Sequence, residues 1–112
     1  MKSIIYKYMK HRCTIYKIGP SMSSDREILA TYPDVPCYVN YEPMTITRPD
    51  MERVVIEGMI FFLPTAPIDV NHIQYEFEQT HPVSRKRMEV YRILAQDDPR
   101  TGALHHFEVM IR

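Results

Sequence analysis

Residues 53–63 read Arg-Val-Val-Ile-Glu-Gly-Met-Ile-Phe-Phe-Leu, which is the most strand-like stretch of the chain. One parity of this stretch is apolar, and in an extended strand it would point to one face of a sheet. Gly58 lies within that parity and predicts a bulge or a sharp bend, as small barrels need at their corners. Pro64 and Pro67 then end the strand. The stretch therefore predicts a half-buried strand of a small barrel or sandwich.

Further strand signals lie on both sides of this stretch. Most show a two-residue alternation of apolar and polar side chains, and they fall around Cys13–Ile15, Val35–Tyr41, Ile73–Phe77, Met88–Leu94 and Phe107–Ile111. The turn residues Asp97-Asp98-Pro99 and Thr101-Gly102 predict a hairpin loop before the last strand. Only Lys2–Lys10 has a helical period instead. We expect a single all-β domain over residues 1–112, a small β-barrel of about six strands with a short N-terminal helix.

The shared parity of apolar residues also predicts the core. A slip of one residue would turn every member of such a set to the opposite face, so each set should be buried together. The predicted core residues are Val54, Ile56, Ile60, Phe62, Ile73, Tyr75, Phe77, Phe107, Val109 and Ile111.

Charge and composition exclude several classes of protein. Fourteen basic residues balance fourteen acidic ones, whereas proteins that hold nucleic acid by phosphate contacts usually carry a basic excess. The N-terminal apolar run is interrupted by lysines, so no signal peptide is expected there. No apolar run is long enough for a membrane span. Without an export signal the chain should remain in the cytoplasm of the cell that makes it, with Cys13 and Cys37 as buried free thiols.

The search for chemistry finds no convincing catalytic or metal-binding pattern. His105 and His106 are adjacent, and neighbours on a strand point to opposite faces, so only one of them should face a given site. Glu76, Glu78 and Glu108 lie on polar strand faces, without a phosphate-binding loop or a nucleophile motif. We therefore expect no enzyme, no metal and no cofactor. The basic cluster 85–87 is expected to solvate a turn.

The order of landmarks along the chain resembles a known family. A short N-terminal helix leads into His11-Arg12-Cys13-Thr14-Ile15, and a polar loop ends at Asp34-Val35-Pro36-Cys37. A long strand closes in Phe61-Phe62-Leu63-Pro64, the segment 66–73 follows, and the chain ends in His105-His106-Phe107-Glu108-Val109-Met110-Ile111-Arg112. In order, spacing and length this sequence is similar to the head-closure (stopper) or head–tail joining proteins of tailed bacteriophages.

This resemblance implies a structural role in the virion neck. The chain would form a homo-oligomeric ring, a dodecamer, below the portal and adaptor, retain packaged DNA by contact in the channel, and receive the tail proteins. It would be made in the cytoplasm of the bacterial host. The resemblance also implies a long loop between the second and third strands that reaches toward the channel, here Glu42–Glu52. The candidate gate residues are Pro43, Met44, Thr45, Ile46, Thr47, Arg48, Pro49 and Asp50.

Other functions remain open on the sequence alone. The loop 42–52 could be a plain surface hairpin. A tail-completion or tail-terminator protein would sit on the other side of the same joint. From a different class, the eight tyrosines and four phenylalanines could build the stacking surface of a small OB-like nucleic-acid-binding module. A metal-dependent enzyme ranks last.

Overall fold

The computed structural model of the chain describes residues 8–19, 27–72 and 74–112. These residues form β-strands and no α-helix, which confirms the all-β fold. In chain order the strands are β1 (His11–Gly19), β2 (Glu27–Asn40), β3 (Met44–Thr47), β4 (Arg53–Ile56), β5 (Gly58–Phe62), β6 (Tyr75–His81), β7 (Met88–Asp97) and β8 (Leu104–Ile111). Of the short helix predicted over Lys2–Lys10, residues 2–7 lie outside the described residues, and the described residues 8–10 contain no α-helix.

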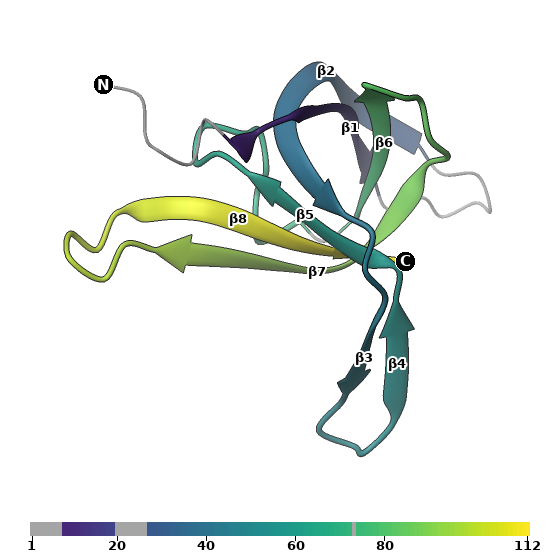
Figure 1. Cartoon of the computed structure of the whole chain (residues 1–112), viewed down its shortest axis with the longest axis vertical. Helices are drawn as coiled ribbons and strands as arrows, with labels where there is room; N and C mark the ends of the chain where they lie inside the picture. Colours follow the sequence, from purple (N-terminus) through teal and green to yellow (C-terminus); the bar gives the residue numbers. More distant parts are fainter. Residues whose placement is uncertain (1–7, 20–26, 73) are drawn as a thin grey trace.

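Six of the strands close into a barrel. They are hydrogen-bonded in the order β1-β2-β5-β8-β7-β6, every pair is antiparallel, and β6 pairs with β1 to complete the circuit. The remaining two strands, β3 and β4, form a separate two-stranded sheet. Figure 1 shows this hairpin projecting from the end of the barrel, and the distal part of the β7–β8 hairpin extending from its side. The six-stranded barrel matches the sequence prediction, whereas the extra hairpin was expected to be a loop.

The inward parity of the barrel strands supplies the core. Eight of the ten predicted core residues are buried: Ile56, Ile60, Phe62, Tyr75, Phe77, Phe107, Val109 and Ile111. Val54 is only half-buried, and Ile73 lies outside the described residues. Cys13, Ile15, Cys37, Val39 and Met88 complete the interior. The aromatic rings of Phe62 and Phe77 meet there with centroids 5.5 Å apart.

The predicted strand 53–63 is interrupted at Gly58, and this break explains the error on Val54. A Cβ atom built on Gly58 would lie 2.1 Å from the backbone oxygen of Asn40, a distance that no side chain tolerates. Because Gly58 has no Cβ atom, β5 can begin directly beside the backbone of Asn40, where β2 ends. Residues before Gly58 belong to the projecting hairpin, so Val54 lies outside the barrel core.

Strand β2 is longer than the sequence indicated. The stretch up to Asp34 was expected to be a polar loop, but Glu27–Asn40 is one strand. The pairing with β1 runs from Glu27 to Cys37, and pairing with β5 begins only at Cys37. Adjacent Ile28 and Leu29 are both exposed, so this half of the strand carries no alternation that could reveal it. A bulge opposite β1 and a positive φ of 57° at Asp34 bend the strand.

Candidate functional site

The predicted gate loop is an ordered β-hairpin, which we call the arm: β3, the tip 48–52, and β4. Met44 pairs with Ile56 and Thr47 pairs with Arg53, so the two strands are fully in register. The arm therefore contains all of the predicted gate residues except Pro43, which lies just before β3, and it adds residues 51–56, most of which had been assigned to a core strand or to the loop. The stretch Glu42–Glu52, expected as a long loop that could also be a surface hairpin, forms a hairpin, because Thr45-Ile46-Thr47 has a pairing partner in β4.

The tip is a tight turn stabilised by its own polar groups. The amide of Met51 donates to the carbonyl oxygen of Arg48 at 2.9 Å, and the amide of Arg48 donates to the carbonyl oxygen of Glu52 at 2.8 Å. Pro49 occupies the second position of this turn, where its fixed φ is favourable. Asp50 Oδ1 accepts the amide of Glu52 at 3.1 Å. The Arg48 guanidinium lies 3.7 Å from Asp50 and 3.5 Å from Glu52, so the charges at the tip largely compensate one another.

Met51 is the residue at the tip that the sequence analysis missed. Its φ is +68°, in the left-handed region that a non-glycine residue rarely adopts. Its side chain is 79% exposed, the largest value among the exposed large hydrophobic residues of the described chain. The signal was present in the sequence, because an apolar residue directly after Pro49-Asp50 falls on the position where such a turn needs a positive φ.

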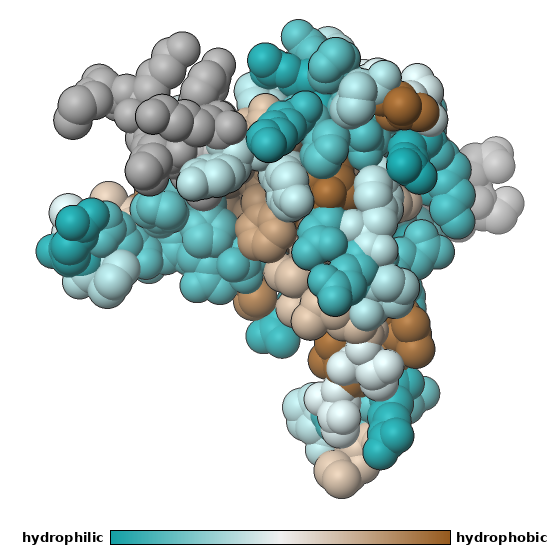
Figure 2. Space-filling view, viewed as in Figure 1, coloured by the Kyte–Doolittle hydropathy of each residue, from teal (hydrophilic) through white to brown (hydrophobic). Residues whose placement is uncertain are grey.

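Much of the arm's apolar surface faces solvent. Ile56 is fully buried at the root, while Ile46 and Val54 are half-buried. Met44 is 43% exposed and Val55 is 64% exposed. Figure 2 shows hydrophobic surface both near the root of the arm and at its tip. An arm that projects from the barrel with this much exposed apolar surface is typical of an element that packs against another molecule.

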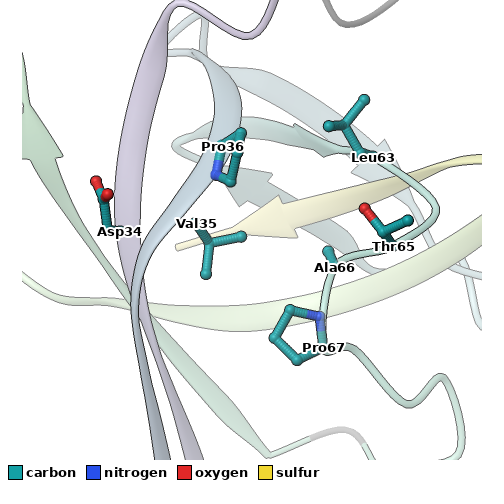
Figure 3. Close-up of a pocket in the computed structure, with 7 residues that line it drawn as sticks. All are labelled: Asp34, Val35, Pro36, Leu63, Thr65, Ala66 and Pro67. Atoms are coloured by element: carbon teal, nitrogen blue, oxygen red, sulfur yellow. The ribbon is translucent and has the colours of Figure 1, made fainter. Parts of the chain in front are cut away.

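Two small concave surfaces lie on the described part of the chain. A groove of about 360 Å³ separates the arm from β7, lined on the arm side by residues 46–49 and on the barrel side by Tyr91 and Arg92. A second, mainly apolar pocket of about 170 Å³ lies between the bend of β2 and the turn after β5 (Figure 3). Its walls include Val35, Leu63 and Pro67, with Asp34 as its one ionisable side chain. Neither surface gathers the pair of catalytic groups that an enzyme needs.

The histidine pair is arranged differently from the sequence expectation. His105 and His106 were expected to face opposite sides of β8, yet their Nδ1 atoms lie 2.8 Å apart. His106 Nε2 lies 3.1 Å from Glu108 Oε1, and Gln96 donates to the other oxygen of Glu108 at 3.3 Å. These contacts turn the two rings toward each other at the start of the strand. Within the described residues, no three His, Cys, Asp or Glu side chains form a group that could hold a metal ion.

The acidic and basic residues considered from sequence are paired with side chains of the barrel wall. Glu78 accepts the hydroxyl of Tyr16 at 3.0 Å. Arg87 lies 3.7 Å from Glu76, and its guanidinium carbon lies 3.9 Å from the centroid of the Tyr16 ring. In the same basic cluster Lys86 lies 3.5 Å from Glu57, and Arg85 lies over the ring of Tyr41. The cluster is thus occupied by contacts within the chain.

The two cysteines are buried free thiols, which confirms the prediction for Cys13 and Cys37. A hydrogen bond with Cys37 and burial both raise the pKa of the Cys13 thiol. Since the thiolate is the reactive form, a raised pKa keeps Cys13 unreactive. The thiols therefore contribute packing to the core.

Comparisons with known proteins identify no relative: no family model, curated protein or solved structure matches the chain. No helix long and apolar enough to cross a membrane occurs in the described residues. The arm is therefore the candidate functional site on the strength of its geometry and exposed surface alone.

Proposed function

We propose that this chain is a structural subunit of the neck of a tailed bacteriophage. It forms a homo-oligomeric ring below the portal and adaptor, closes the DNA-filled head and provides the surface to which the tail attaches. The chain contributes no catalytic step in this role. The resemblance in sequence landmarks motivates the proposal, and the projecting arm with its exposed Met44, Met51 and Val55 is the structural observation that carries it.

The energetics of the arm favour a site in an assembly. A two-stranded hairpin alone is marginally stable in water, and only Ile56 of the arm's apolar residues is fully buried. In a cyclic ring, identical elements of neighbouring copies meet around one axis. Arms arranged in this way would pack Met44 and Ile46 against their neighbours and narrow the channel. The apolar surface that is exposed in a single copy is then buried.

The charge of the arm suits a gate that must release DNA. Arg48 is compensated by Asp50 and Glu52 at the tip. Phosphate contacts give strong, salt-dependent binding when cations are uncompensated. A nearly neutral arm blocks the channel sterically without holding the DNA, so the gate can open when the tail attaches.

The proposal is tested by shortening the arm without unfolding it. Residues 46–54 are replaced by Asn-Gly, which keeps the pairs Met44–Ile56 and Thr45–Val55 and closes them with a favoured two-residue turn. The purified variant is added to tailless, DNA-filled heads that carry the portal and adaptor, and the DNA accessible to nuclease is measured. We expect the variant to bind the heads and leave their DNA accessible, whereas the wild type protects it. Val70→Ser, which changes an exposed apolar residue outside the arm, serves as the control.

Two results would contradict this proposal in different ways. If heads with the shortened variant keep their DNA as well as heads with the wild type, the arm is not the gate and is an ordinary surface hairpin. If the wild type itself does not bind heads that carry portal and adaptor, the neck role is wrong. Binding to the end of purified tails instead would favour the tail-completion alternative.

A further inference from the structure

A row of four rings crosses the outer wall of the barrel. The row consists of His11 on β1, Tyr38 on β2, Phe61 on β5 and His106 on β8, so it spans four neighbouring strands. Consecutive ring centroids are 5.3, 6.3 and 6.2 Å apart. Each ring contacts the next one, so the row is one continuous aromatic surface.

The row lies outside the core. Tyr38 stands between buried Cys37 and Val39, and Phe61 stands between buried Ile60 and Phe62, so both rings point outward from the pleat. Tyr38 and Phe61 are directly paired across β2 and β5. Tyr38 is 37% exposed. Phe61 and the two histidines are half-buried.

The two ends of the row carry opposite charge. At the His11 end, burial lowers the pKa of this histidine, and the Coulombic effects of His81, Arg85 and Lys10 lower it further. Lys10 directly precedes His11 in the chain, so a cationic side chain lies at this end of the row. At the other end Glu108 is paired with Phe61 across β5 and β8 and is hydrogen-bonded by His106. The row is thus basic at one end, aromatic in the middle and acidic at the other end.

These features make the row complementary to itself. A two-fold axis between Tyr38 and Phe61 would place each of these rings on the other ring of a second copy. The flanking distances, 5.3 Å on one side and 6.2 Å on the other, are similar, so His11 would also meet a second copy's His106. Lys10 would then face Glu108. A closed two-fold contact of this kind is the commonest form of association between identical chains.

We propose that the aromatic row is a homodimer interface, in which two copies of the chain pack their rows face to face about a two-fold axis. Aromatic side chains dominate the binding energy of protein interfaces, and the charged ends set the register. This contact uses the barrel wall and is independent of the arm and of the proposed neck function.

A second copy fits the row better than single-stranded nucleic acid, which also stacks on exposed rings. A nucleic-acid platform combines its rings with a basic groove along the phosphates. Here one end carries Glu108, and the chain has no net charge. The opposite charges at the ends favour a partner of the same dipolar kind.

The test measures association of the full chain by sedimentation equilibrium. The wild type is expected to dimerise, and Phe61→Ser should raise the dissociation constant by roughly tenfold or more. Lys10→Glu and Glu108→Lys are each expected to weaken the dimer, while the double variant recovers affinity because the charges are exchanged across the two-fold axis. Val83→Ser, which changes an exposed apolar residue outside the row, should leave association unchanged. Circular dichroism establishes that each variant is folded.

Three outcomes would overturn the inference. The first is a wild type that stays monomeric at submillimolar concentration. The second is a wild-type dimer that Phe61→Ser leaves intact, which would place the dimer interface elsewhere. The third is tight binding of a single-stranded oligonucleotide that is lost in Phe61→Ser, which would assign the row to nucleic acid. None of these outcomes bears on DNA retention by the arm, so the two proposals fail separately.

Discussion

The barrel and the arm are built from the same antiparallel pairing, but they differ in what their side chains bury. In β5 alternate residues, from Gly58 through Ile60 to Phe62, are fully enclosed. Strand β4 precedes β5 in the chain, with one residue between the two strands. In β4 only Ile56 is enclosed, and Val55 is largely exposed. The barrel therefore has a core of its own, whereas the arm buries little within the single chain. Under the proposed function, the exposed apolar side chains of the arm are buried by a partner.

The largest expected effect on stability comes from a substitution in the barrel core. Phe62→Ala removes a fully buried ring that packs 5.5 Å from the Phe77 ring, and should lower the free energy of unfolding by about 3–5 kcal/mol. Phe61→Ala, on the next residue of the same strand, changes an outward ring and should cost about 1 kcal/mol or less. Urea denaturation at low protein concentration measures both. Equal losses for the two variants would mean that the assignment of inward and outward faces is wrong.

A smaller but still large effect is expected at the junction between barrel and arm. Gly58→Ala places a Cβ atom 2.1 Å from the Asn40 oxygen, so the backbone of β2 or β5 must shift. Overpacking of this kind should cost about 1–3 kcal/mol. The matched control is Gly102→Ala, where φ is +74° but nothing lies within 4 Å of the new methyl group, so it measures backbone strain without a clash. Thermal unfolding that is no lower for Gly58→Ala than for the control would contradict this reading of the junction.

The same comparison explains how far the sequence could be interpreted. Alternation identified the barrel core, because Ile60, Phe62 and Val109 are buried on one face and their neighbours are not. Alternation could not locate the start of β5, since Val54 continues the apolar parity of this strand across Gly58. It also missed residues 27–34, which have a pairing partner on one side only. Periodicity reports burial, so strands that bury little are the ones it does not reveal.

The aromatic row illustrates a second limit. Tyr38 and Phe61 stand on the outward parity of their strands, and the sequence gives no reason to connect them. Their contact follows from the pairing of β2 with β5, which joins residues far apart in the chain. The sequence did propose the arm as the candidate site, although it described the arm as a loop and stopped one residue before Met51.

A pH-dependent effect on the free energy of unfolding is expected from His11, at the edge of the barrel. His11 Nδ1 accepts the amide of Val39 at 2.9 Å, and burial followed by the charges of His81, Arg85 and Lys10 lowers its pKa below the usual 6.5. The unfolded chain then binds a proton more readily than the folded one, so stability falls as the pH drops below about 6.5 and levels off below the lowered pKa. His11→Asn keeps an acceptor but does not titrate.

The measurement is therefore the difference in unfolding free energy between wild type and His11→Asn from about pH 7.5 to about pH 5, a range that includes the ordinary pKa of histidine. We expect the wild type to lose more stability than the variant over this range, by less than the loss caused by Gly58→Ala. His105→Asn serves as a control at a histidine that does not bind a strand amide in this way. Parallel pH profiles for wild type and His11→Asn would mean that this histidine stays neutral or charged alike in both states.

The smallest expected effect concerns the tip of the arm. Met51 adopts a φ of +68°, which strains any residue with a Cβ atom, so Met51→Gly should stabilise the turn locally by about 1 kcal/mol. We expect the arm to open without unfolding of the barrel, so the gain should appear as roughly fivefold slower hydrogen exchange of the arm amides and not as a higher melting temperature. Met51→Ala removes the side chain but keeps the strain, so it separates the two causes and should exchange like the wild type. A melting temperature that falls by several degrees in both variants would show that the exposed Met51 side chain stabilises the folded chain. Arm amides that exchange no more slowly in Met51→Gly than in the wild type would contradict the assignment of strain to Met51.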